Sequence, residues 1–107
     1  MNIENTNAFI YLTNGFYFGF VQNNILFSRN GTYLGWVENS YVWDAQGRFR
    51  GKIVDINSNK YIIRDRFSMP PLAKTPKPDV SSVMPPNPPP NIQPINLPIN
   101  LMDAFSD

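Results

Sequence analysis

Apolar residues recur along the first 65 positions in short runs, and polar turn dipeptides separate the runs. Runs of five to seven residues that are rich in aromatic and β-branched types are typical of strands. Short connections favour antiparallel pairing of consecutive strands. We therefore expect an all-β antiparallel meander of seven or eight short strands, near residues 8–13, 16–22, 25–29, 32–38, 41–45, 48–56 and 60–65.

A sixteen-residue repeat underlies the runs, and its aligned segments read Gly-Phe-Tyr-Phe-Gly-Phe-Val, Gly-Thr-Tyr-Leu-Gly-Trp-Val and Gly-Arg-Phe-Arg-Gly-Lys-Ile. Two sets of glycines carry it: Gly15, Gly31 and Gly47, then Gly19, Gly35 and Gly51. A repeated unit of this size is one supersecondary motif. The sequence thus predicts hairpin petals at residues 16–29, 32–45 and 48–65, with a barrel-like closure.

The turns follow the same period. Asn14-Gly15 and Asn30-Gly31 predict two-residue type I′ turns, because Asn tolerates positive φ and Gly has no Cβ to clash. Turns of this length fix the register, so faces can be counted. One face then collects Tyr17, Tyr33 and Phe49 together with Gly19, Gly35 and Gly51, which we call the inner glycines. We expect this face to be the core. The other is aromatic until it turns basic, and it includes Phe18, Leu34, Trp36, Tyr41, Trp43, Arg48, Arg50 and Lys52.

The chain divides into a β-hairpin repeat domain, residues 1–65, and an extended Pro-rich tail, residues 66–107, which holds all eleven prolines. Pro85–Pro90 favours polyproline II. The alternating residues Ile95, Leu97, Ile99 and Leu101 would share one face, and Leu101–Phe105 could form one helical turn. With Phe105, these residues are the candidate latch that covers the aromatic face of the same or a neighbouring subunit. The alternative is a flexible tail with chance alternation.

The composition argues against several classes of function. Nine Lys and Arg against eight Asp and Glu give a net charge of +1, which argues against a nucleic acid partner, and the chain has neither Cys nor His. No catalytic residue, metal site or cofactor is expected, and enzyme activity is not expected. The uncharged stretch from Asn5 to Ser28 contains turn dipeptides and is not a membrane span. Since the N-terminus lacks the basic residues of a secretory signal, we expect a cytoplasmic protein.

Two groups of residues are candidates for binding. Arg48, Arg50 and Lys52 lie opposite Tyr41 and Trp43 on neighbouring strands, the combination used by single-stranded nucleic acid binders. Trp36 and Trp43 could line a pocket for an apolar or sugar ligand. Each group has a structural alternative: basic stems packed on aromatic rings at a solvated edge, or burial under the tail. Asp44, beside a turn, is expected to accept hydrogen bonds from turn amides.

The repeated Asn-Gly-x-Tyr-x-Gly-Trp-Val and Tyr-Val-Trp-Asp pattern, followed by a proline-rich tail, resembles the small bacterial 4-fold beta flower proteins. The resemblance covers roughly residues 8–65. It implies a pseudo-four-fold arrangement of hairpin petals, and it brings no assigned activity and no catalytic residues. The fourth petal would have to come from residues 1–13, where the equivalents of the glycines are missing.

The leading functional hypothesis is a non-enzymatic interaction or assembly module, expected to be a homo-oligomer, with an unidentified protein partner as a further possibility. The alternative is a binding module for a small ligand or single-stranded nucleic acid that uses the Trp43 and Arg50 side.

Overall fold

The structure is a computed structural model that describes residues 8–77 and 80–106. The N-terminal residues on which the expectation about a secretory signal rests lie outside this part. The strands are β1 (Ala8–Tyr11), β2 (Tyr17–Gln22), β3 (Ile25–Ser28), β4 (Tyr33–Glu38), β5 (Tyr41–Asp44), β6 (Phe49–Ile56), β7 (Asn59–Asp65) and β8 (Leu101–Asp103). The described residues contain no helix, so the all-β prediction is confirmed, and the helical turn expected at Leu101–Phe105 is wrong because β8 starts there.

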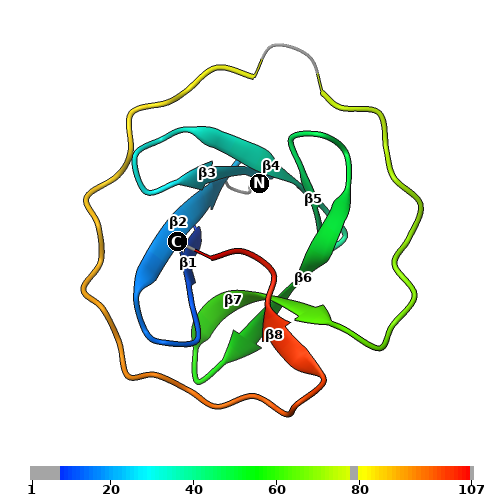
Figure 1. Cartoon of the computed structure of the whole chain (residues 1–107). Coiled ribbons are helices and arrows are strands. Elements are labelled where there is room, and N and C mark those ends of the chain that lie inside the picture. The colour runs from blue at the N-terminus through cyan, green and yellow to red at the C-terminus, as the bar shows by residue number, and fades with distance from the viewer. Residues whose placement is uncertain (1–7, 78–79, 107) are drawn as a thin grey trace, which may run out of the picture.

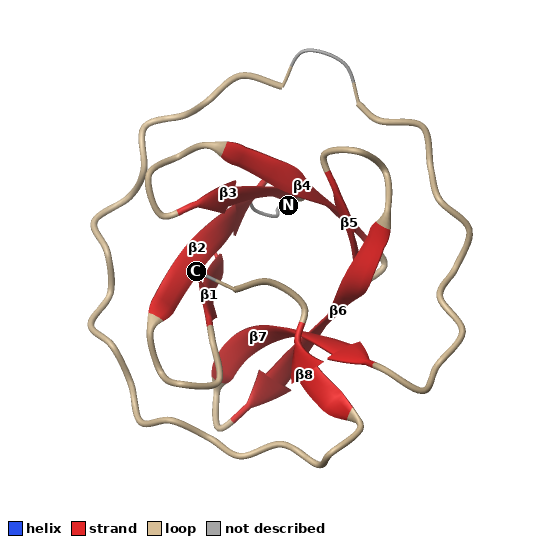
Figure 2. Ribbon diagram, viewed as in Figure 1, coloured by secondary structure: helices blue, strands red, loops and turns tan. Residues whose placement is uncertain are grey.

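The strands form a closed barrel (Figures 1 and 2). Consecutive strands from β1 to β8 pair antiparallel, and β1 also pairs in parallel with β7, at Ile10 with Lys60 and Tyr11 with Tyr61. Seven strands therefore close the barrel, and β8 pairs with β7 from outside it. The part of the chain that the structure describes has no helix that could span a membrane.

The fourth repeat unit comes from both ends of the described chain. Ile10 of β1 pairs with Gly19, as Leu26 of β3 pairs with Gly35 and Val42 of β5 pairs with Gly51, so β1 is the second strand of a fourth unit. Its first strand is represented only by β8, whose following residue, Ala104, donates its amide to the Ile62 carbonyl.

The two sets of turns differ in geometry. Positive φ occurs at both central residues of the second set, Asn23-Asn24, Asn39-Ser40 and Asn57-Ser58, as in type I′ hairpins. In the first set only the glycine has positive φ, and the Gly15 amide bonds to the carbonyl of Leu12, three residues back. The prediction of type I′ turns at Asn14-Gly15 and Asn30-Gly31 is wrong. These turns have one more residue, and the glycine supplies the left-handed conformation.

A bulge follows each glycine turn and reverses part of the face assignment. Tyr11 pairs with Tyr17 while Ile10 pairs with Gly19, which leaves Phe18 as an extra residue. Leu34 and Arg50 are the corresponding extra residues. Phe18 consequently packs in the interior and Tyr17 outside, the opposite of the sequence expectation. A bulge adds one residue to one strand, so it shifts every earlier side chain to the other face.

The barrel interior is a small aliphatic and aromatic core. Its fully buried members include Ile10, Leu26 and Val42. The C-terminus returns to this interior after β8 (Figure 1), where the Phe105 ring lies 5.5 Å from the Phe18 ring. The chain thus plugs its own barrel with its last described residues.

Between β7 and β8 the chain runs around the outside of the barrel as a belt, residues 66–77 and 80–100 (Figure 1). It meets each glycine turn in the same way. The amides of Lys74, Val83 and Ile92 donate to the carbonyls of Gly47, Gly31 and Gly15 at 2.8–3.0 Å. A Cβ on any of these glycines would lie within about 2 Å of the carbonyl oxygen of the same belt residue. Each glycine is therefore required both by its φ and by the approach of the belt.

The belt presents every third residue to the barrel over 80–95. The half-buried positions are Val80, Val83, Pro86, Pro89, Ile92 and Ile95. Three residues is the period of a polyproline II helix. Ile92, Ile95, Leu97 and Leu101 pack on an outer cluster of Tyr11, Tyr17, Tyr61 and Ile63, whereas Ile99 is 84% exposed and does not share their face. The belt closes where it began, since the Arg66 amide donates to the Asn100 carbonyl.

Candidate binding groove

A groove lies at the third petal, where the pairing between β6 and β7 ends early. The first petal pairs Gly19 with Ser28, and the second pairs Gly35 with Asp44. In the third petal the pairing starts only at Lys52 with Ile63, so Gly51 and Arg64 do not pair. The groove has a volume of about 870 Å³ between β6, the end of β7 and the start of the belt. We call it the basic groove; its lining includes Tyr41, Arg48, Phe49, Arg50, Lys52, Arg64, Met69 and Pro70.

Asp44 holds two of the groove's arginines. Its carboxylate accepts hydrogen bonds from the amides of Gln46 and Arg48 at 3.0 Å, as the sequence predicted. It also forms ion pairs with the guanidinium groups of Arg48 and Arg50 at 3.2 and 3.4 Å. Burial alone would raise its pKa, but the two amides and the Arg48 charge outweigh burial and hold the pKa below its usual value. Asp44 is therefore a structural anion whose bonding capacity is used within the turn.

Arg50 occupies the inner edge of the groove rather than the aromatic outer face. It is the bulged residue, and its guanidinium donates to the Ala104 carbonyl at 2.7 Å and lies 4.2 Å from the centre of the Phe105 ring. Its charge thus fixes the C-terminal plug. Arg48, by contrast, keeps 69% of its side chain exposed.

Lys52 and Arg64 are exposed cations of the groove, like Arg48, but no described residue forms an ion pair with either. Lys52 lies 5.7 Å from the centre of the Tyr41 ring. The one carboxylate nearby on the lining, Asp65, accepts bonds from the Phe67 amide, the Ser68 hydroxyl and the Asn100 side chain, and these donors lower its pKa. The groove therefore carries positive charge that its own acids do not neutralise.

The belt supplies an apolar wall of the groove. Met69, Pro70 and Pro71 line it, and Met69 is 92% exposed. Phe67 and Leu72 lie beside this wall in sequence and are also exposed. Consecutive exposed apolar side chains are characteristic of a contact surface.

The predicted Trp36 and Trp43 site is closed. Both side chains are buried, and their rings stack with centroids 6.3 Å apart. Lys74 and Lys77 of the belt lie over the Trp43 and Trp36 rings at 4.5 and 5.1 Å, and Lys74 also forms an ion pair with Glu38. Of the residues singled out from the sequence, the structure therefore gathers Tyr41, Arg48, Arg50 and Lys52 at the groove and places the two tryptophans under the belt.

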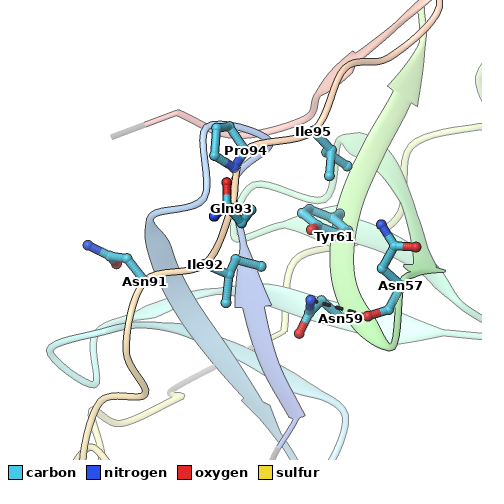
Figure 3. A pocket seen from close by; sticks show the side chains of 8 residues that line it. All are labelled: Asn57, Asn59, Tyr61, Asn91, Ile92, Gln93, Pro94 and Ile95. Atoms are coloured by element: carbon cyan, nitrogen blue, oxygen red, sulfur yellow. Dashed lines mark hydrogen bonds between the residues drawn. The ribbon is translucent and has the colours of Figure 1, made fainter.

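A second hollow, of about 790 Å³, lies where the belt passes the end of the third petal (Figure 3). Its lining has no charged residue and consists of Asn57, Asn59, Tyr61, Asn91, Ile92, Gln93, Pro94 and Ile95. Ile92 and Ile95 face Tyr61, while Asn91 points away from it. The Asn91 side-chain oxygen accepts a hydrogen bond from the Tyr17 amide at 3.0 Å. The belt uses this hollow for its own docking.

Sequence reasoning missed Arg64, Met69 and the belt residues that contact the glycine turns. A signal for the last group was present. Pro76, Pro85 and Pro94 are spaced by nine and each follows a docking residue by two. The opening between β6 and β7 left no comparable signal, because it depends on where pairing stops.

The structure defines the chain as a closed β-barrel built from hairpin repeats and encircled by its own proline-rich belt. The chain belongs to the 4-fold beta flower protein family, whose family model matches residues 1–106. This family has no assigned activity. Comparisons with curated proteins and with solved structures found no match.

Proposed function

We propose that the chain is a non-enzymatic interaction module whose partner binds in the basic groove. The opening of the third petal supports this most directly. Two petals keep their strands paired up to the inner glycine, whereas in the third Gly51 and Arg64 are not paired. The lining of this space combines exposed cations with an exposed apolar wall, a combination that favours binding over packing.

The chemistry of the groove supports binding rather than catalysis. The chain has no His and no Cys, and the carboxylates of Asp44 and Asp65 are occupied by turn donors. No described group of three or more acidic side chains could hold a metal ion. In this proposal the belt keeps the aromatic face covered in the same chain and supplies one wall of the groove.

Site-specific photo-crosslinking tests the proposal. A benzophenone amino acid replaces Met69 in the full chain, and the same probe replaces Met84 as a control at a similarly exposed position of the belt, next to the Val83 contact with Gly31. We expect a discrete adduct in cells from position 69 alone, and its loss when Lys52→Glu and Arg64→Glu are added. Identical adduct patterns at both positions, or an adduct insensitive to the charge reversals, would reject the groove.

Self-association is a second candidate function. The belt exposes large apolar side chains around its circumference, among them Leu72, Met84 and Ile99. Such side chains are common in subunit contacts. Light scattering of the full chain tests this. A homo-oligomer that becomes monomeric with Met84→Ser and Ile99→Ser supports assembly through the belt, and a monomer at all concentrations excludes it.

A further inference from the structure

We infer that the ligand of the basic groove is an extended acidic peptide segment in which acidic and apolar side chains alternate. The inference rests on the proposed function and adds the chemical class of the partner. It follows from the distribution of charge, the position of the apolar wall and the strand edges at the opening.

Charge specifies an anionic ligand. Lys52 and Arg64 lack carboxylate partners among the described residues, and Arg48 uses only part of its guanidinium on Asp44. The acidic residues near them are already bonded to turn amides, hydroxyls or amide side chains. Carboxylates from outside the chain would complete these cations with charge-assisted hydrogen bonds.

The apolar wall specifies the rest of the ligand. Met69, Pro70 and Pro71 line the same groove as the cations. In an extended peptide, successive side chains point to opposite sides. A segment with alternating acidic and apolar residues therefore places its carboxylates on Lys52 and Arg64 and its apolar groups on the belt.

The strand edges favour an extended backbone. Pairing between β6 and β7 stops at Lys52 and Ile63, so the chain on either side of the opening resembles the edge of a sheet. Edges of this kind accept an added strand, and main-chain hydrogen bonds then contribute to affinity.

Single-stranded nucleic acid fits the groove less well. Binding of nucleic acid uses a row of stacking platforms and a clear basic footprint. The net charge of the chain is +1, and of the groove's aromatic rings Tyr41 is the more exposed while Phe49 is half-buried. An oligonucleotide is therefore a competing outcome of the test.

Selection from a library of random displayed peptides on the immobilised full chain tests the inference. We expect selected peptides to be enriched in Asp and Glu alternating with apolar residues. For a synthetic peptide of this kind, Lys52→Glu and Arg64→Glu should each weaken binding by at least about tenfold. The control Arg66→Glu, with the same charge change beside the groove but outside its lining, should change it by less than about twofold.

Three results would overturn the inference: selected peptides without acidic enrichment, affinities unaffected by both charge reversals, or tighter groove-dependent binding of an oligothymidylate probe. The crosslinking experiment separates this failure from that of the proposed function. A charge-dependent adduct at position 69 with a non-acidic contact segment leaves the groove as the binding site and rejects only the acidic peptide.

Discussion

Two sets of glycines in this chain have different structural roles, although one period relates them. Gly15, Gly31 and Gly47 have positive φ and touch the belt, whereas Gly19, Gly35 and Gly51 let the next strand approach closely. A Cβ on Gly35, for example, would lie 2.0 Å from the Trp43 carbonyl oxygen. The outer set thus fixes belt docking, and the inner set fixes the contact between neighbouring strands.

Gly31→Ala tests the outer set. The residue has φ of +86°, and an added Cβ would lie 1.9 Å from the Val83 carbonyl oxygen. Left-handed backbone costs a non-glycine residue about 1–2 kcal/mol, and displacement of the belt adds to this. We expect the free energy of unfolding in urea to fall by more than that amount, together with faster exchange of the Val83 amide proton. The neighbouring exposed change Thr32→Ala is the control, and equal effects of the two would contradict the assigned role.

The lowered pKa of Asp44 predicts that this carboxylate contributes to the loss of folding stability at low pH. Because its pKa is lower in the folded chain than the ordinary value of 3.8, its contribution is complete above that pH and is lost as the pH falls through the lowered value. Asp44→Asn should therefore reduce stability at neutral pH and flatten the loss on acidification. Urea unfolding from neutral pH down to about pH 3 measures both slopes. Parallel slopes for the two proteins would show that Asp44 has no part in the loss of stability at low pH.

At the scale of elements, strand positions followed from the sequence, but faces did not. The seven expected strands match β1 to β7 closely because turn residues and β-forming runs are local signals. The faces of Tyr17, Phe18 and Arg50 were assigned wrongly because one extra residue in each bulge reverses the count. That residue is accommodated by the curvature of the closed barrel, which depends on the whole sheet.

The belt shows the same division between local and distant causes. Its extended form follows from its prolines. Its register follows only in part. Of the alternating residues Ile95, Leu97, Ile99 and Leu101, all but Ile99 pack on the outer cluster, whereas the period of three over 80–95 was not predicted. The groove was found in part, since Tyr41, Arg48, Arg50 and Lys52 were selected, but Arg64 and Met69 reach it only through the closed fold.

Truncation after Asp79 tests the belt as a structural element. It removes the Val83 and Ile92 contacts, β8 and the Phe105 plug, and it uncovers the Tyr11, Tyr17 and Tyr61 cluster. We expect the midpoint of thermal unfolding to fall by more than about 10 °C, with binding of a hydrophobic dye. Truncation after Pro98, which removes β8, the plug and the Asn100 contact with Arg66 but keeps the Val83 and Ile92 contacts, should have a smaller effect. A chain cut after Asp79 that keeps its solubility, stability and oligomeric state would refute the latch.

For the whole molecule, the belt connects elements that are far apart in sequence. It leaves the barrel at the end of β7, meets three petals in the reverse of their order and returns beside its own start. Folding of such a segment requires the barrel surface to exist first, because each contact is between residues distant in sequence. Stability of the closed form therefore depends on many weak contacts that act together.

Cleavage of the belt tests whether the stability of the closed form is spread over many contacts. A protease site inserted between Asn87 and Pro88 falls between the Val83 and Ile92 contacts. After cleavage, the two pieces should co-elute in size-exclusion chromatography, because β8, the outer cluster and the plug hold the smaller one. They should separate in denaturant at a lower concentration than unfolds the uncut chain. Release of the smaller piece in native buffer would contradict the prediction.

The matched spacing of petals and belt has an evolutionary consequence. The glycine turns advance by sixteen residues, and the belt residues that meet them, Lys74, Val83 and Ile92, retreat around the barrel by nine. Duplication of one petal would leave a turn without a belt residue, and lengthening of the belt alone would misalign every later contact. A lineage that changes the number of petals needs two insertions of different length at two separate places in the gene. The number of petals and the length of the belt must therefore change together. We expect family members to vary in side chains and loops more readily than in the number of petals.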